Sequence, residues 1–295
     1  MIMALSLAVA SFVLAGLLAA LPLRSPLHDA AGSAALRKLQ RVPVPRIGGL
    51  VLLLVVAVPL LRADRTELLI ALGIAFAAGL IDDLIRGGLG AGPKLGVQLA
   101  AALTIAWLTP QSAWWLVPLL IVAFNVINTW DNSDGALSGI TLLGAACVGE
   151  RLLAALLAGF LPWNTVLRRD PSAPRAYLGD SGSHLLAVWI VLEPRLLPAL
   201  VLPALDLAWV CVQRLRARQP PWVGDRRHLA QVLEARGLGL APRLTLLGLL
   251  ALPVWVLPLQ WGCAATLSAL LVTRILARAP AAPDNPSPPQ APRHP

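Results

Sequence analysis

The sequence predicts an all-α, polytopic integral membrane protein with about 10–11 transmembrane helices, an N-terminus outside and a cytoplasmic C-terminus. Three observations support this fold class. Apolar residues make up 57% of the 295 residues and charged residues only 13%, a balance that water-soluble folds do not show. The apolar residues fall in blocks of roughly 15–20, the length with which a helix crosses about 30 Å of hydrocarbon. The basic residues lie in the loops between these blocks.

Eleven apolar blocks are interpreted as helices. The first has no charge before Arg24 and lacks the basic segment that begins a signal peptide, so we expect a span. Several blocks are short for a span, especially 136–149 and 183–193, which leaves nine or ten crossings with one re-entrant or interfacial segment as an alternative. In chain order the expected helices occupy residues 2–23, 47–61, 67–81, 95–109, 112–129, 136–149, 151–167, 183–193, 196–213, 244–258 and 261–277. Residues 1–278 form one transmembrane domain, and the Pro-rich tail, 279–295, is expected to be disordered.

The basic residues predict the orientation. With these helices, 20 of the 24 Lys and Arg residues lie on one side of the membrane, which the positive-inside rule makes cytoplasmic. Orientation therefore explains the net charge of +9, and no nucleic-acid partner is expected. The three cysteines have neither disulfide-framework nor zinc-site spacing. The oligomeric state stays open, because apolar helix faces look alike toward lipid and toward a second copy.

Three acidic clusters lie at cytoplasmic ends of apolar blocks, and each stands beside small or Gly residues that let a ligand approach the backbone. Together they predict a site for magnesium and phosphate. Each cluster alone is equally well explained as a polar helix terminus, and their common sidedness favours the site. A helical end would place the second cluster on one face with Asn128 and Asn125. The clusters are Asp82 and Asp83 in GLIDDL, Asp131 and Asp134 in NVINTWDNSDG, and Asp180 in YLGDSGS.

A long cytoplasmic loop, about residues 214–243, carries the segment WVGDRRHLAQVLEARGLG. Its Arg226 and His228 could supply cationic contacts to a diphosphate. Alternatively the segment is a basic juxtamembrane stretch that touches anionic lipid, and composition leaves the two readings equal. Asp206, inside an apolar block, is interpreted as a buried structural partner for Arg or backbone groups.

The motifs and their order resemble the polyprenyl-phosphate N-acetylhexosamine-1-phosphate transferases, glycosyltransferase family 4. Within them the chain is most similar to the bacterial undecaprenyl-phosphate N-acetylglucosamine-1-phosphate transferases. The resemblance covers most of the chain, and its eleven-helix, N-outside arrangement agrees with the charge count. It is carried by PRIGG at 45–49, IDDL at 81–84, GLGAGPKLGVQ at 88–98, NVINTWDNSDG at 125–135, GFLPWN at 159–164, YLGDSGS at 177–183, PALDLAWVCVQRL at 203–215 and GDRRHLAQVLEARGL at 224–238.

This resemblance implies an enzyme of the bacterial inner membrane with a cytoplasmic active site. The enzyme would transfer a sugar-1-phosphate, N-acetylglucosamine-1-phosphate first, from a UDP-sugar to a polyprenyl phosphate, releasing UMP and initiating lipid-linked glycan synthesis. Magnesium, or manganese in its place, would screen the repulsion between the two anionic substrates.

The resemblance also implies roles for the site residues. Asp180 and Asp131 would hold the metal, Asp82 would deprotonate the lipid phosphate, and Asp83 would orient Lys94 or the metal shell. Asp134 completes the catalytic carboxylates. The expected substrate contacts are Asn125 and Asn128, toward the nucleotide or the Asp rotamers, with Lys94, Arg226 and His228 toward phosphates.

The chain departs from the family pattern at two places. Where the branch has His-x-His-His after its DR pair, the residues here are His228, Leu229, Ala230 and Gln231, and Asn132 replaces a glycine of the acidic motif. These departures leave two alternatives open: another UDP-N-acetylhexosamine donor and a catalytically impaired membrane scaffold. A transporter is a separate rival class. A transporter needs carboxylates near the middle of the membrane, and only Asp206 qualifies.

Overall fold

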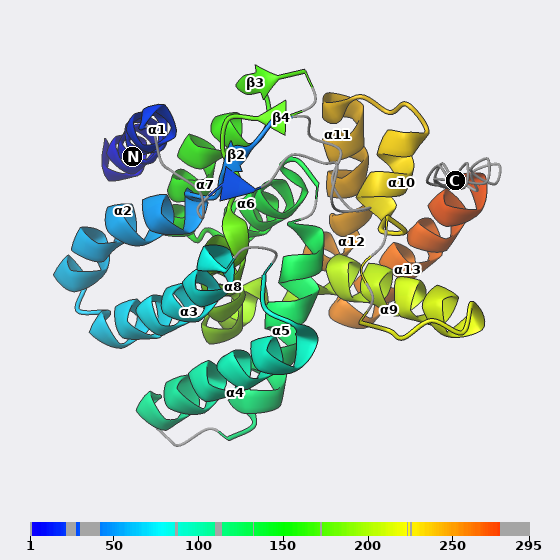
Figure 1. Ribbon diagram of the computed structural model, residues 1–295, viewed down its shortest axis with the longest axis horizontal. Helices are drawn as coiled ribbons and strands as arrows, with labels where there is room; N and C mark the ends of the chain where they lie inside the picture. The colour runs from blue at the N-terminus through cyan, green and yellow to red at the C-terminus, as the bar shows by residue number, and fades with distance from the viewer. Residues whose placement is uncertain are drawn as a thin grey trace, which may run out of the picture.

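The computed structural model arranges α-helices around one central helix, α8 (Gly179–Leu192) (Figure 1). It describes residues 2–21, 28–29, 42–85, 88–109, 114–131, 133–171, 173–222, 224 and 226–277. The expected tail and seven of the basic residues used to predict the orientation lie outside the described residues: Arg24, Arg37, Lys38, Arg41, Arg86, Arg278 and Arg293.

All eleven predicted helices are present. Predicted helix 196–213 is a 3-10 turn, η1 (Pro194–Leu200), continued by α9 (Val201–Arg216), and predicted helix 244–258 is split at Pro253 into α11 (Leu240–Ala251) and α12 (Pro253–Val256). Predicted helix 183–193 begins earlier, at Gly179, which puts Asp180 inside the first turn of α8. The other predicted helices are α1 (Ile2–Ala20), α2 (Gly48–Arg62), α3 (Thr66–Leu84), α4 (Ala91–Leu108), α5 (Leu116–Trp130), α6 (Ala136–Val148), α7 (Arg151–Asn164) and α13 (Leu259–Leu276).

Two kinds of element were not predicted. A short helix, α10 (Leu229–Ala235), lies in the long loop. Two small antiparallel ribbons also form, β1 (His28–Asp29) with β2 (Val44–Pro45), and β3 (Arg168–Asp170) with β4 (Ala173–Pro174). A parallel bridge between Arg46 and Tyr177 joins the β2 segment to the residues that lead into α8. These ribbons are too short to have a periodic pattern that a sequence could reveal.

Helix α8 is the core of the bundle. Every residue from Ser181 to Val191 is buried, and α2, α3 and α5 pack against this helix. An α-helix enclosed on all sides makes no contact with lipid, so the protein interior must satisfy its polar side chains. This explains how α8 can carry Ser181, Ser183 and His184, all buried, in an otherwise apolar helix.

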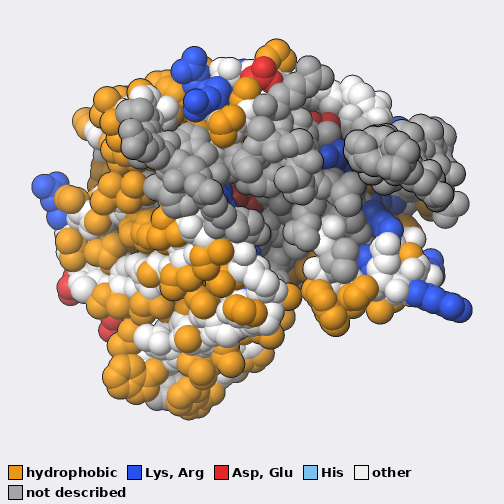
Figure 2. Space-filling model, viewed as in Figure 1, with side chains coloured by type: hydrophobic (Ala, Val, Ile, Leu, Met, Phe, Trp, Pro, Cys, Tyr) orange, Lys and Arg blue, Asp and Glu red, His pale blue; other side chains and the backbone are white. Residues whose placement is uncertain are grey.

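The outer surface is that of a membrane protein. On α2, for example, Leu52 and Val56 are buried, while Leu54 and Val58 on the opposite face are 52% and 53% exposed. Hydrophobic side chains cover much of the face in Figure 2, an exposure that water would not tolerate. Of the described helices, three are long and apolar enough to span a bilayer: Ile2–Ala20, Pro194–Arg216 and Leu259–Leu276. The protein is thus an all-α, polytopic membrane protein, as predicted.

One end of the bundle carries marks of a membrane–water interface. The strongly exposed tryptophans of this end lie where α4 ends, where α5 begins and where α13 begins, and tryptophan favours that interface. Arg65 and Arg195, two of the basic residues predicted outside, share Glu193 here at 3.7 and 2.8 Å. The acidic clusters lie at the opposite ends of α3 and α5. The four tryptophans are Trp107, Trp114, Trp115 and Trp261.

Candidate active site

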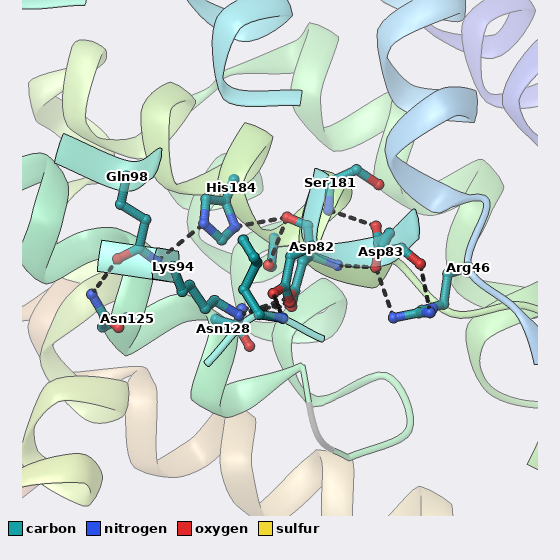
Figure 3. A network of polar contacts seen from close by, with 12 residues as sticks. Arg46, Asp82, Asp83, Lys94, Gln98, Asn125, Asn128, Ser181 and His184 are labelled. Carbon is teal, nitrogen blue, oxygen red and sulfur yellow. Dashed lines mark hydrogen bonds and ion pairs between the residues drawn. The ribbon is translucent and has the colours of Figure 1, made fainter. Parts of the chain in front are cut away.

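The three acidic motifs meet at one end of the bundle, as predicted from their common sidedness. The first contact joins the C-terminal end of α3 to the N-terminus of α8. Asp83, fully buried, accepts hydrogen bonds from the backbone amides of Asp180 at 3.0 Å and Ser181 at 2.9 Å (Figure 3). These amides have no partner within their own helix, and their positive dipole end favours a carboxylate. Arg46 pairs with the same carboxylate at 3.1 Å, so Asp83 is a structural clamp.

A lysine joins the carboxylates of Asp82 and Asp180. Lys94 Nζ, near the start of α4, lies 3.1 Å from Asp82 Oδ2 and 2.7 Å from Asp180 Oδ2. The second oxygen of Asp82 accepts the Leu89 amide, and that of Asp180 accepts Asn128 Nδ2, both at 2.5 Å. Of the two roles expected for Asp83, the contact with Lys94 is not formed, and the role toward a metal shell stays a prediction. Asp82 contacts Lys94 instead, because the two neighbouring carboxylates point to different partners around α3.

Gly79 and Gly179 lie where α3 and α8 pack against each other. A Cβ on Gly79 would lie 2.2 Å from the carbonyl oxygen of Asp180. Gly179 has φ +74°, and a Cβ there would lie 2.8 Å from Asp83 Oδ2. Both positions therefore need glycine so that α3 and α8 can approach each other closely. We expected these glycines to admit a ligand to the backbone, and instead they admit a neighbouring helix.

The second acidic motif is a turn. Helix α5 ends at Trp130, so Asp131 and Asp134 do not share a helical face as predicted. Asp134 pairs with Arg168 of β3 at 2.7 Å. Burial raises the pKa of the Asp134 carboxyl, and Arg168 offsets part of this rise. Burial also raises the pKa of Asp131 well above its ordinary value, and the negative charge of Asp83 adds to the effect.

The two predicted asparagines have separate partners. Asn128 donates to Asp180 and so fixes a carboxylate rotamer, one of the two roles expected for it. Asn125, one turn earlier, donates to Gln98 Oε1 at 3.0 Å and to the Ile121 carbonyl at 2.8 Å. Gln98 in turn contacts His184, which the sequence analysis did not single out. A histidine four residues after Asp180 inside an apolar block was the available signal.

The long loop is anchored by Asp206. This buried carboxylate accepts His228 Nδ1 at 2.9 Å and the Leu229 amide at 3.1 Å, and it pairs with Arg274 of α13. The prediction that Asp206 is a buried partner for Arg and backbone groups is confirmed. His228, expected to contact a diphosphate, uses one ring nitrogen for this anchor, whereas Arg226 is exposed.

The same loop touches the acidic turn. A cavity of about 10 Å³ lies between Thr129, Trp130 and Ser133 on one side and the start of α10 on the other, where His228, Ala230 and Gln231 line it. The two positions that depart from the family histidines therefore face the residues just before and within the Asp131–Asp134 turn.

The carboxylate oxygens of this site are the hard, negatively charged ligands that a divalent cation such as Mg²⁺ prefers. Among the described residues no group of three His, Cys, Asp or Glu side chains is arranged to hold a metal ion. Mg²⁺, however, is usually bound by one or two carboxylates together with water and substrate phosphates. Four of the five carboxylates, Asp82, Asp83, Asp134 and Asp180, are paired with three cations: Arg46, Lys94 and Arg168. The site therefore has more carboxylates than cations among these residues.

Comparison with known proteins identifies relatives across most of the chain. It is 31% identical to the undecaprenyl-phosphate alpha-N-acetylglucosaminyl 1-phosphate transferase of Thermotoga maritima, over 78% of this chain and 80% of the relative. It is 28% identical to the decaprenyl-phosphate N-acetylglucosaminephosphotransferase of Mycolicibacterium smegmatis, over 63% and 64%. A probable undecaprenyl-phosphate N-acetylglucosaminyl 1-phosphate transferase of Bacillus subtilis is 24% identical, over 68% and 69%. No protein-family model matches the chain.

Proposed function

We propose a function from one premise: the chain belongs to the family of polyprenyl-phosphate N-acetylglucosamine-1-phosphate transferases, a membership that the Thermotoga maritima relative establishes. It transfers N-acetylglucosamine-1-phosphate from UDP-N-acetylglucosamine to a polyprenyl phosphate, releases UMP, and so initiates a lipid-linked glycan. The observation that carries this proposal is the meeting of the three acidic motifs: Lys94 joins Asp82 to Asp180, and Asn128 of the second motif donates to Asp180.

The reaction brings two anions together. An oxygen of the lipid phosphate forms a bond to the β-phosphorus of the donor, and the bond from that phosphorus to UMP breaks, with UMP keeping the electron pair. Lys94 is the cation that we place against these phosphates, because it joins two of the motifs and its side chain is 23% exposed, while those of Asp82 and Asp180 are 8% and 17% exposed. A phosphate that takes Lys94 from Asp82 leaves that carboxylate free to accept a proton.

Asp82 acts as the base only when the acceptor needs one. A phosphate monoester loses its second proton near pH 6, so a monoanionic acceptor is a minor species at neutral pH. Asp83 takes no part in proton transfer, since Arg46 and the α8 amides occupy its oxygens. Asn128 keeps the Asp180 carboxylate turned toward Lys94.

Magnesium is proposed as the cofactor, with manganese as its substitute. Asp180 and Asp131 would hold it, and the excess of carboxylates over paired cations in the site suits a divalent ion. When bound, the ion would neutralise charge on the diphosphate and on the departing UMP. The carboxylates would share it with phosphate oxygens, which agrees with the absence of a closed three-ligand cage among the described side chains.

We propose that the site faces the cytoplasm of a bacterial inner membrane. The support is the distribution of basic residues, because 20 of 24 belong to loops on the side of the acidic motifs. The relatives compared above are bacterial enzymes. UDP-sugars are made in the cytoplasm, which is the compartment of the nucleotides.

The function is tested with the full chain in proteoliposomes that contain undecaprenyl phosphate. UMP release is measured with UDP-N-acetylglucosamine and Mg²⁺, and lipid-free vesicles give the background. Release that needs both lipid and donor supports the proposal. Turnover with UDP-N-acetylgalactosamine alone would identify another hexosamine donor, and no turnover with either would support an impaired scaffold.

The metal assignment has its own variant. Asp180→Asn should lower turnover by about 10²-fold and raise the Mg²⁺ concentration needed for half-maximal rate. Asp64→Asn is the matched control, since it makes the same change beside the far end of α3, where the residue has φ 55° and Asn is tolerated. Equal metal requirements in Asp180→Asn and wild type would exclude Asp180 as a ligand.

A further inference from the structure

His184 belongs to a polar chain that crosses three helices (Figure 3). It stands on α8 one turn after Asp180 and is 1% exposed. Its Nδ1 is 2.7 Å from the Asp180 carbonyl oxygen, and its Nε2 is 3.2 Å from Gln98 Nε2 on α4. Its ring stacks on Phe124 of α5, with centroids 4.7 Å apart and planes at 21°. The proposed chemistry gives this histidine no role.

The two ends of the chain fix the direction of its hydrogen bonds. At one end is the Asp180 carbonyl oxygen, which only accepts, so His184 must carry its proton on Nδ1. At the other end is the Ile121 carbonyl, which also only accepts, so the Asn125 atom that faces it is the amide nitrogen. That same nitrogen lies 3.0 Å from Gln98, which must therefore present its oxygen to Asn125.

Only one protonation state of His184 completes this chain. With its oxygen toward Asn125, Gln98 presents its amide nitrogen to His184, and Nε2 must accept. A second proton on the ring would place the N–H of His184 Nε2 against the N–H of Gln98 Nε2, and neither group can accept. Turning the Gln98 amide would move the same conflict to Asn125, whose own turn would set oxygen against the Ile121 carbonyl. An unsatisfied buried polar group costs roughly 1–3 kcal/mol, so the neutral Nδ1–H tautomer is selected.

The chain sets the register of α4 against α8. Lys94 and Gln98 are four residues apart on α4, and Asp180 and His184 are four apart on α8, so each pair shares a helical face. The contacts Lys94–Asp180 at 2.7 Å and Gln98–His184 at 3.2 Å are thus two successive rungs between the same helices. The Gln98–His184 contact fixes the spacing of α4 and α8 at which the Lys94–Asp180 ion pair forms.

We propose that His184 is a positioning residue of the transferase: as the neutral Nδ1–H tautomer it pins the Asp180 peptide and aligns α4, so that the Asp180 carboxylate meets Lys94. This inference rests on the proposed function for its kinetic meaning. The Asp180 peptide is then held from both sides, its amide by Asp83 and its carbonyl by His184. Ser183 also donates to this carbonyl, at 3.1 Å, so loss of the histidine should weaken the alignment without abolishing it.

The kinetic test is His184→Phe. Phenylalanine keeps a ring that can stack on Phe124 and removes both polar contacts. We expect kcat to fall about tenfold, equivalent to about 1.4 kcal/mol, while the KM for UDP-N-acetylglucosamine stays within twofold, because His184 is buried and is not among the proposed donor contacts. Trp189→Phe is the matched control, a change to a fully buried aromatic residue of the same helix, and its kcat should stay within twofold. A His184→Phe protein with wild-type kcat would overturn the inference.

The tautomer gives a readout that does not depend on activity. Nitrogen-15 NMR of histidine-labelled protein, assigned by the signal lost in His184→Phe, should show a neutral ring protonated on Nδ1. An Nε2–H tautomer in an active wild-type protein would refute the positioning role alone. An inactive wild type with the Nδ1–H tautomer would refute the proposed function and leave the tautomer assignment standing.

Discussion

Gly79→Ala tests whether the close approach of α3 and α8 builds the active site. The added Cβ would lie 2.2 Å from the Asp180 carbonyl oxygen, and the neighbour is backbone, which cannot swing away as a side chain can. Ordinary contact begins at 3.4 Å, so the two helices must separate by about 1.2 Å. Overpacking of this kind costs roughly 1–3 kcal/mol in stability, and a displacement of about 1 Å at reacting groups can cost about 10² in rate.

The control for this variant lies on the same helix. Gly73→Ala places a Cβ that meets nothing within 4 Å, and alanine favours a helix over glycine by roughly 1 kcal/mol. We expect Gly73→Ala to keep wild-type turnover and to unfold at the same or a higher temperature. Gly79→Ala should lose about 10²-fold in UMP release and melt earlier, measured by size-exclusion chromatography after heating. A Gly79→Ala protein with normal kcat would show that the Asp83–α8 contact does not position Asp180.

Further predictions concern the far end, the loop and the orientation. Burial raises the pKa of Glu150, so its ionised form weakens the fold. Glu150→Gln should therefore raise the melting temperature at pH 7, with a gain that vanishes as pH falls below about 4; an equal gain at both pH values would contradict this cause. Gln231→His should change donor affinity with little loss of stability, whereas Ala230→His must force a ring into a cavity of about 10 Å³ and should cost roughly 1–3 kcal/mol; unchanged donor selectivity in both would separate the loop from the donor. In a cysteine-free background, Trp115→Cys should react with an impermeant thiol reagent in intact cells and Trp222→Cys only after permeabilisation, since both side chains are exposed at opposite ends; the reverse pattern would invert the orientation.

The helices could be predicted because each is an apolar block closed by charge, Pro or Gly. The convergence of Asp82, Asp131 and Asp180 could also be predicted, because alternate spans bring every second loop to one side of the membrane. Helix α10 was missed since its seven residues carry less than two full turns of periodicity.

The partners of each carboxylate could not be predicted from the sequence. Adjacent residues on a helix point about 100° apart, so which of Asp82 and Asp83 faces α8 depends on the rotation of α3, and packing alone fixes that rotation. The same holds for Gly79, whose closeness to Asp180 joins residues far apart in sequence. His184 was overlooked because its partners come from α4 and α5.

The order in which the chain is made gives Arg46 an importance beyond the finished fold. The α8 amides that bind Asp83 follow it by 97 residues, and at about 5–20 residues per second they leave the ribosome some 5–20 s later. During that interval Asp83 lies at the end of α3 without the two amide donors that it has in the finished fold. Arg46 precedes Asp83 in the chain and pairs with it at 3.1 Å. The ion pair can therefore form as soon as α3 is inserted, and it shields the carboxylate until α8 arrives.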